Sequence, residues 1–113
     1  MTKNITIGNA AGTWVVRAGG AVIGETTQAR EVIEDGYDPV IYFPRDDIAM
    51  AFLDRSATET TCPWKGKASH YTFAAKSGAI VDAAWSYETP IAGMEAIACH
   101  LAFYPDKATV ERV

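Results

Sequence analysis

The sequence lacks the features that mark membrane-spanning, secreted and zinc-knuckle proteins. It contains no run of about eighteen apolar residues, and its first residues carry no apolar stretch of the kind that a secretory signal needs. The two cysteines, Cys62 and Cys99, do not form a CxxC pair, so a structural zinc site is not expected. We therefore expect a cytoplasmic protein with reduced thiols, no membrane partner and no metal.

Positive charge is also scarce. The chain carries 10 Lys and Arg against 14 Asp and Glu, which gives a net charge of −4. Because nucleic-acid binding needs clustered positive charge to displace counterions from phosphates, no nucleic-acid partner is expected. The phosphate-binding patterns GxGxxG and GxxxxGK[ST] are missing as well, which disfavours Rossmann and P-loop architectures.

What the sequence does contain is a series of short β-rich runs separated by turn residues. Residues 13–18 and 21–26 flank Gly19-Gly20 and predict a hairpin, and residues 69–74 and 79–87 predict a second one. Further strands are predicted at 40–43, 100–104 and 108–113, while 27–34 fits either a strand or a short helix. We expect one domain over residues 1–113.

Helical signals are few. Residues 45–53 are compatible with one or two helical turns, and residues 90–99 contain the only good helical pattern, with apolar residues three to four positions apart. The predicted fold is therefore mainly β, either a small antiparallel barrel or two packed sheets, with one or two short helices.

The stretch from Thr61 to Tyr71 is the densest in chemically capable side chains, with a thiol, two lysines, an imidazole and two aromatic rings. Proline and glycine interrupt it, so we interpret it as a loop that a rigid scaffold presents.

With these residues in view, the chain resembles the DUF427 family of small proteins of unknown function. The segments that carry the resemblance are Tyr42–Ile48, Thr61–Ala68 with Tyr71, Ala84–Pro90 and Ala102–Pro105, together with the Val16–Gly20 hairpin. The resemblance implies a β-tent or Mss4-like fold, a group in which some members bind ligands in aromatic cages and others bind zinc or reduce methionine sulfoxide. One label for the family, nucleotidyltransferase, also implies an enzyme. This sequence lacks the paired cysteine knuckles of the zinc-bearing members, so the resemblance does not carry a zinc site over to it.

Cys62 is the candidate catalytic nucleophile, because cationic side chains at Lys65 and Lys67 favour the reactive thiolate. The alternative is a structural cysteine that precedes Pro63.

Lys65 and Gly66 can present a cation and an open backbone N–H to an anionic ligand, or they form an ordinary turn. Arg45 can fork onto a carboxylate or phosphate, or it pairs locally with Asp46 or Asp47. Magnesium binding by these acidic residues is the weaker alternative, since the N-terminal dipole of a helix also favours them there.

Four aromatic residues alternate with small or polar residues on predicted strands, and they either wall a ligand site or fill the core: Tyr42, Tyr71, Trp85 and Tyr87. The preferred hypothesis is a small polar or anionic ligand bound between segments 42–47, 62–71 and 85–90, and the sequence leaves any cofactor unknown. The competing hypotheses are an enzyme in the same cleft, through Cys62 or nucleotidyl transfer, and a homodimeric interaction module that uses a β edge or the 91–98 segment.

Overall fold

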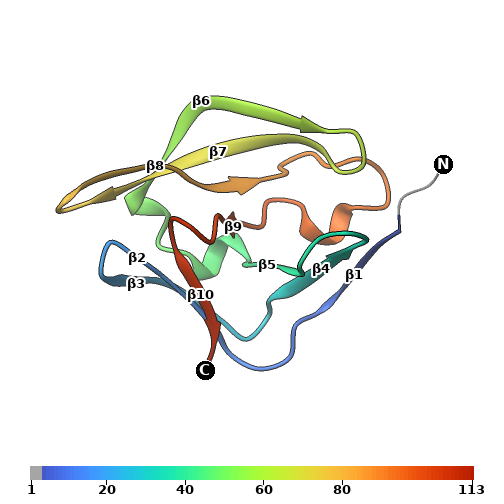
Figure 1. Ribbon diagram of the computed structural model, residues 1–113, viewed down its shortest axis with the longest axis horizontal. Coiled ribbons are helices and arrows are strands. Elements are labelled where there is room, and N and C mark those ends of the chain that lie inside the picture. The colour runs from blue at the N-terminus through green and yellow to red at the C-terminus, as the bar shows by residue number, and fades with distance from the viewer. Residues whose placement is uncertain (1–3) are drawn as a thin grey trace.

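Turn residues divide the chain into strands, and the computed structural model describes residues 4–113. The strands are β1 (Ile5–Asn9), β2 (Trp14–Ala18), β3 (Ala21–Thr26), β4 (Arg30–Glu34), β5 (Val40–Tyr42), β6 (Leu53–Cys62), β7 (Gly66–Ala75), β8 (Gly78–Ser86), β9 (Ala102–Phe103) and β10 (Thr109–Arg112) (Figure 1). Within the described residues the only helical elements are three single 3-10 turns, η1 (Arg45–Asp47), η2 (Met50–Phe52) and η3 (Glu95–Ile97). The predicted mainly β fold is confirmed.

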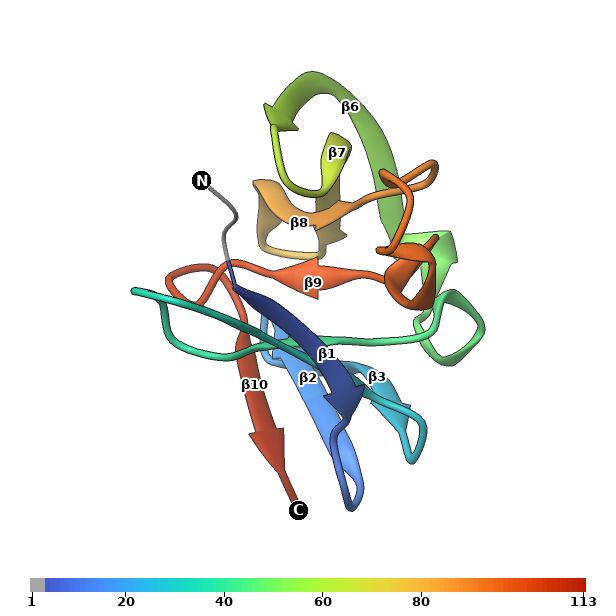
Figure 2. The ribbon, with the colours of Figure 1, turned by 90° about the vertical axis from the view of Figure 1, so that its right-hand side faces the viewer.

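The strands pair antiparallel in three sheets, with the orders β1-β4-β5, β10-β2-β3 and β6-β7-β8-β9. Figure 2 shows the four-stranded sheet on one side of the molecule and the two three-stranded sheets on the other. Two backbone hydrogen bonds of 2.8 Å between Phe43 and Leu101 join the end of β5 to the chain just before β9. The arrangement is therefore one of packed sheets and not a closed barrel.

The β2–β3 hairpin forms where the sequence predicts it. Its two turn glycines have positive φ, 57° at Gly19 and 80° at Gly20, which is the conformation that a tight hairpin turn requires. Ala18 pairs with Ala21 across the turn. The second predicted hairpin is also present, as β7 and β8.

The interpretation of residues 61–71 as a loop is wrong. Cys62 ends β6 and pairs with Gly66 at the start of β7, so only the residues between them form a turn. Gly66 has a φ of +116°, a conformation that favours glycine. The rest of the stretch, up to Tyr71, lies inside β7, where Lys67 is exposed and residues 68–71 are buried.

The helix predicted over residues 90–99 is wrong as well, since only η3 forms there. Gly93 and Cys99 both have positive φ, 96° and 61°, and these conformations interrupt a right-handed helix. Residues 45–52 contain two short helical turns, η1 and η2, and between them the Ala49 N–H donates to the Ile23 carbonyl of β3 at 2.8 Å. Among residues 4–113, no helix has the length and apolar character to cross a membrane.

Two clusters of buried side chains hold the sheets together. The larger lies between β2, β3 and the four-stranded sheet and centres on Val16, Phe43 and Leu101, each fully buried. The smaller contains Tyr42 and Tyr87. Burial of each large side chain contributes about 1.5–3 kcal/mol, so the rings of these tyrosines stabilise the fold as well as shape its surface.

Candidate functional site

One cleft gathers most of the residues that the sequence singles out. It has a volume of about 420 Å³ and lies where β4 and β5 approach the turn between β6 and β7, on the right of Figure 1. Five predicted site residues line it: Tyr42, Cys62, Lys65, Trp85 and Tyr87. The other lining residues are Val32, Glu34, Tyr37, Asp38, Val40, Thr60 and Tyr104.

Aromatic rings form much of its wall and fix one another's positions. The indole Nε1–H of Trp85 donates to the Tyr42 hydroxyl at 3.2 Å, and the two rings meet edge to face with centroids 6.2 Å apart. On its other side Trp85 packs against Tyr104, with a centroid distance of 4.5 Å. These contacts hold the three rings of the wall in fixed positions relative to one another.

The Tyr42 and Tyr87 phenols stay protonated in this setting. Burial is the main cause that raises the pKa of Tyr42, while the hydrogen bond from Trp85 opposes it. Burial also raises the pKa of Tyr87, with a further contribution from Cys62 and Glu34. Both hydroxyls therefore keep their hydrogen at neutral pH.

Lys65 lies at the base of this cleft with its charge already paired. Its Nζ donates to Glu34 Oε1 at 2.6 Å and lies 3.8 Å from Cys62 Sγ, and only 8% of the residue is exposed. The turn is held from the other side by the Ile91 N–H, which donates to the Lys65 carbonyl at 2.8 Å. Lys65 therefore ties the β6–β7 turn to β4, and its charge is largely compensated for any incoming anion.

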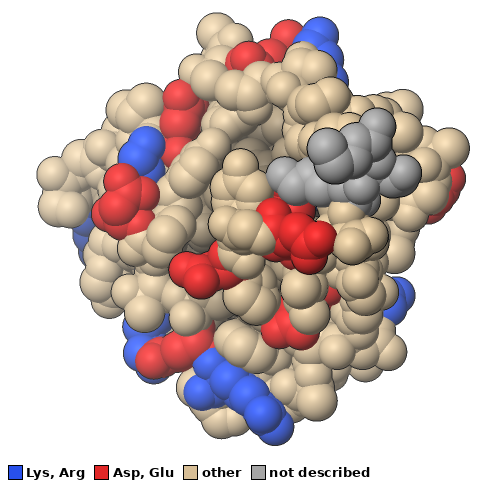
Figure 3. All heavy atoms as spheres, turned by 45° about the vertical axis from the view of Figure 1, so that its right-hand side comes forward, with Lys and Arg blue, Asp and Glu red and all other residues tan. Residues whose placement is uncertain are grey.

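The surface around this cleft is acidic. Glu34 and Asp38 line it, and Figure 3, which brings this side of the molecule forward, shows acidic side chains in the middle of the face and Lys and Arg toward its margin. A field of this sign opposes the approach of anions.

Arg45 and Tyr71 do not join the other predicted site residues. In β7 and β8, Ser69 pairs with Ser86 and His70 with Trp85, and successive pairs point to opposite faces of a sheet. Arg45 and Tyr71 belong to the Ser86 face, whereas Trp85 belongs to the face of the cleft. The single site expected from segments 42–47, 62–71 and 85–90 is thus divided in two.

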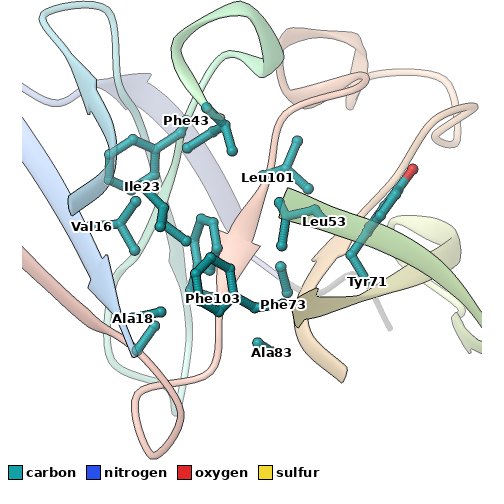
Figure 4. Packing of buried hydrophobic residues seen from close by; sticks show 13 residues of the cluster. Val16, Ala18, Ile23, Phe43, Leu53, Tyr71, Phe73, Ala83, Leu101 and Phe103 are labelled. Atoms are coloured by element: carbon teal, nitrogen blue, oxygen red, sulfur yellow. The ribbon is translucent and has the colours of Figure 1, made fainter. Parts of the chain in front are cut away.

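On the Ser86 face, Arg45 and Tyr71 converge on Glu88. Arg45 Nη2 lies 3.1 Å from Glu88 Oε2, and the Tyr71 hydroxyl donates to the same oxygen at 2.9 Å. Arg55 Nη1 lies 3.3 Å from the second carboxylate oxygen. Figure 4 shows the Tyr71 ring at the margin of the core cluster, with its hydroxyl pointing away from it. Arg45 therefore forms its ion pair with Glu88, and not with Asp46 or Asp47, which was one of the two alternatives that the sequence left open.

The remaining candidates are held in structural contacts. Asp47 accepts a hydrogen bond from the Thr26 hydroxyl at 2.7 Å, and His100 Nδ1 lies 3.0 Å from the Ala98 carbonyl. His70 contacts Tyr104 at 3.0 Å, so neither histidine forms a hydrogen bond to Cys62. In the described part of the chain, no three His, Cys, Asp or Glu side chains are grouped so that they can hold a metal ion.

Sequence reasoning missed several lining residues, of which Tyr104 is the most informative. Its place in the Ala102–Pro105 segment of the family resemblance is the signal that pointed to it. Glu34, Tyr37 and Asp38 gave no signal, because only the pairing of β4 with β5 brings their segment beside Trp85.

A second hollow of about 500 Å³ adjoins this cleft and shares Asp38, Val40 and Trp85 with it. Most of its other lining residues are apolar, among them Trp14 and Phe103. Trp85 therefore lines both hollows.

The sequence was compared with models of known protein families, and one of them matches. The model of the family described as a domain of unknown function, DUF427, matches residues 6–113. The chain belongs to the DUF427 family. The match covers nearly the whole of this DUF427 chain, including every residue that lines the cleft. No match was found among curated proteins.

Proposed function

We propose that this DUF427 protein binds a small polar molecule with a flat, aromatic or apolar part in the cleft lined by Tyr42, Cys62, Lys65, Trp85 and Tyr87. The observation that carries the proposal is the convergence of these residues on one hollow of about 420 Å³. That volume lies within the range of small-molecule sites, which combine an apolar or aromatic wall with a few polar groups.

The polarity of the cleft favours a neutral or weakly charged ligand over an anion. Of the two cations in the predicted site, Lys65 is paired with Glu34 and Arg45 lies on the opposite face of the sheet with Glu88. The other polar groups that line the cleft include the hydroxyls of Tyr42, Tyr87 and Thr60 and the Asp38 carboxylate. The aromatic rings supply stacking surface for a planar group.

The three tryptophans provide a direct test. Trp85 lines the cleft, Trp14 lines the adjoining hollow, and Trp64 lines neither of them. We expect a ligand from a screen of nucleosides, amino-acid derivatives and small heteroaromatic compounds to shift the indole N–H resonance of Trp85 in a saturable titration. The Trp64 resonance should stay in place.

Tyr37→Ala gives the matching mutational prediction. Tyr37 lines the cleft but is 67% exposed, so its removal should cost little stability while it deletes part of the aromatic wall. Loss of one ring contact is expected to weaken binding of a screening hit about two- to tenfold, as measured by calorimetry.

Phe52→Ala is the control, because Phe52 is also an exposed aromatic residue, at 53%, and lies outside the lining of the cleft. The affinity of Phe52→Ala for the screening hit should equal that of the unmodified protein. Equal losses in both variants, or a hit that shifts Trp64 and leaves Trp85 unchanged, would contradict the proposed site.

A further inference from the structure

His70 presents a buried polar atom that the proposed binding site does not use. The residue is 2% exposed and lies in β7 opposite Trp85. Its Nε2 is 3.0 Å from the Tyr104 hydroxyl oxygen, whereas its Nδ1 has no hydrogen-bond partner within residues 4–113. Of the two ring nitrogens, Nε2 is therefore hydrogen-bonded to Tyr104 and Nδ1 has no partner among the described residues.

This asymmetry determines which nitrogen carries the proton. A proton on Nδ1 would leave a buried N–H donor without an acceptor, and orphaned buried donors are rarer than under-satisfied acceptors. A neutral ring protonated at Nε2 avoids this, because its N–H donates to Tyr104 and the bare Nδ1 is only an unused acceptor. The contact is therefore a hydrogen bond from His70 to the Tyr104 oxygen.

The direction of this bond decides what Tyr104 can do. A phenol O–H bond lies in the plane of its ring, so a phenol oxygen that accepts a hydrogen bond on one side of its C–O axis keeps its own hydrogen on the other side of that axis. The planes of the His70 and Tyr104 rings lie within 17° of each other, so the hydroxyl hydrogen points away from His70. Tyr104 lines the cleft, and the cleft is the side toward which we expect its hydroxyl hydrogen to point.

The Tyr104 ring is also held in place. It packs against Trp85, and Lys107 Nζ lies 5.5 Å from its centroid on a face of the ring. Burial, with the charges of Asp82 and Asp106, raises the pKa of the Tyr104 phenol, so the hydroxyl keeps its proton at neutral pH.

We propose that Tyr104 is a specificity-determining residue that donates a hydrogen bond from its hydroxyl to the ligand, and that His70 is the positioning residue that fixes the direction of this donor. The ligand class follows: a flat molecule with an in-plane hydrogen-bond acceptor, such as a ring nitrogen or a carbonyl oxygen. This inference rests on the proposed function and deepens it.

The first test needs no ligand. Long-range ¹H–¹⁵N NMR correlations distinguish the two tautomers of His70 in the labelled full-length protein. We expect Nε2 to be protonated and Nδ1 to be bare. A proton on Nδ1 would reverse the His70–Tyr104 hydrogen bond, turn the Tyr104 hydrogen toward His70 and overturn the inference.

The second test compares pyridine with benzene at about pH 8. The two rings have the same shape, but only pyridine carries an in-plane acceptor, so their ratio of affinities isolates one hydrogen bond. Titrations followed at the Trp85 indole resonance should show pyridine binding about two- to tenfold more tightly. Tyr104→Phe should abolish this preference and leave benzene binding unchanged.

Tyr37→Phe is the control, because it removes a hydroxyl from a ring that lines the same cleft. It should keep the pyridine preference, and a preference that is lost in Tyr37→Phe but kept in Tyr104→Phe would contradict the inference. The two proposals fail differently. If pyridine and benzene bind equally, the inference about Tyr104 alone is overturned. If neither of them nor any screening hit binds, the proposed function fails, and the ligand role of Tyr104 fails with it.

Discussion

Glu88 shows how one carboxylate can organise a whole cluster of side chains. Its two oxygens take hydrogen bonds from Tyr71 and Ser69 and face the guanidinium groups of Arg45 and Arg55. Partial burial alone would raise the pKa of Glu88. The hydrogen bonds from Tyr71 and Ser69 and the charges of the two arginines outweigh burial, so the pKa lies below its ordinary value.

The sign of this shift predicts an acid-sensitive contribution to stability. Because the pKa is lower in the folded protein, the stabilisation is complete above the ordinary glutamate pKa of about 4.3 and is lost as the pH falls through the folded value. Glu88→Gln should therefore lower the free energy of unfolding by about 1–2 kcal/mol at pH 7, since Glu88 is partly exposed. Below about pH 4 the difference from the unmodified protein should shrink.

Urea unfolding at both pH values measures this difference. Glu111→Gln is the matched control, because Glu111 pairs with Arg17 in a more exposed ion pair that should contribute little. A deficit of Glu88→Gln that stays constant between pH 7 and pH 3 would contradict the assigned role of the charge.

At the level of single residues, the sequence indicated which side chains have binding chemistry but not which of them meet. Arg45 and Trp85 both stood out, yet the alternation of faces along β8 puts Ser86 beside Arg45 and turns Trp85 to the other side. Predicting that division required the register of β7 against β8, and a one-residue shift in register would have exchanged the faces.

Among the elements, β6 is the one whose local structure depends most on a partner. It is an edge strand, and its pairing with β7 is irregular between Arg55 and Glu59. Over this interval Asp82 of β8 accepts hydrogen bonds from the Ser56 and Thr58 hydroxyls at 2.6 and 2.7 Å. Asp82 has a φ of +50°, so an unusual backbone conformation in β8 places the carboxylate that holds the irregular part of β6.

Asp82→Ala should therefore loosen β6. Loss of both hydrogen bonds is expected to speed amide hydrogen exchange in β6 about tenfold, while exchange in β2 and β3 stays unchanged. Asp82→Asn is the control, because asparagine tolerates positive φ and its amide oxygen still accepts a hydrogen bond. Exchange in β6 that is as slow in Asp82→Ala as in Asp82→Asn and the unmodified protein would contradict the role assigned to Asp82.

The contrast between β6 and the β2–β3 hairpin explains which elements the sequence predicts. Two consecutive glycines mark the hairpin turn locally, and β-rich runs flank them. Residues 53–62 have no such marker, because most of their side chains are exposed and the strand lacks an alternating apolar pattern. The apolar spacing in residues 90–99 had the opposite effect. Met94 and Ile97 suggested a helix, yet only the single turn η3 forms, with Ile97 buried in the smaller core cluster and Met94 packed against it.

Across the whole molecule, the two sides of the fold depend on a close contact at Gly24. This residue of β3 bridges to Ile48, just after η1, and η1 leads by way of η2 into the four-stranded sheet. A Cβ atom at position 24 would lie 2.3 Å from Ile48 Cδ1 and 3.1 Å from the Asp47 carbonyl oxygen. The end of the Ile48 side chain can rotate away, but the Asp47 carbonyl belongs to the backbone and can move only with η1.

Gly24→Ala should consequently destabilise the protein by about 1–3 kcal/mol, the usual effect of overpacking a close-packed interior. Gly8→Ala is the control within the same fold, because Gly8 also lies in a strand but a Cβ atom there would meet no atom within 4 Å. Its stability should differ from that of the unmodified protein by no more than about 0.5 kcal/mol. Urea unfolding of the two variants checks the prediction. If the two variants lose the same stability, the loss is a general effect of replacing glycine in a strand, and β3 and η1 can move apart to make room for a Cβ atom. A loss confined to Gly24→Ala means that this contact sets the distance between the two sides of the fold.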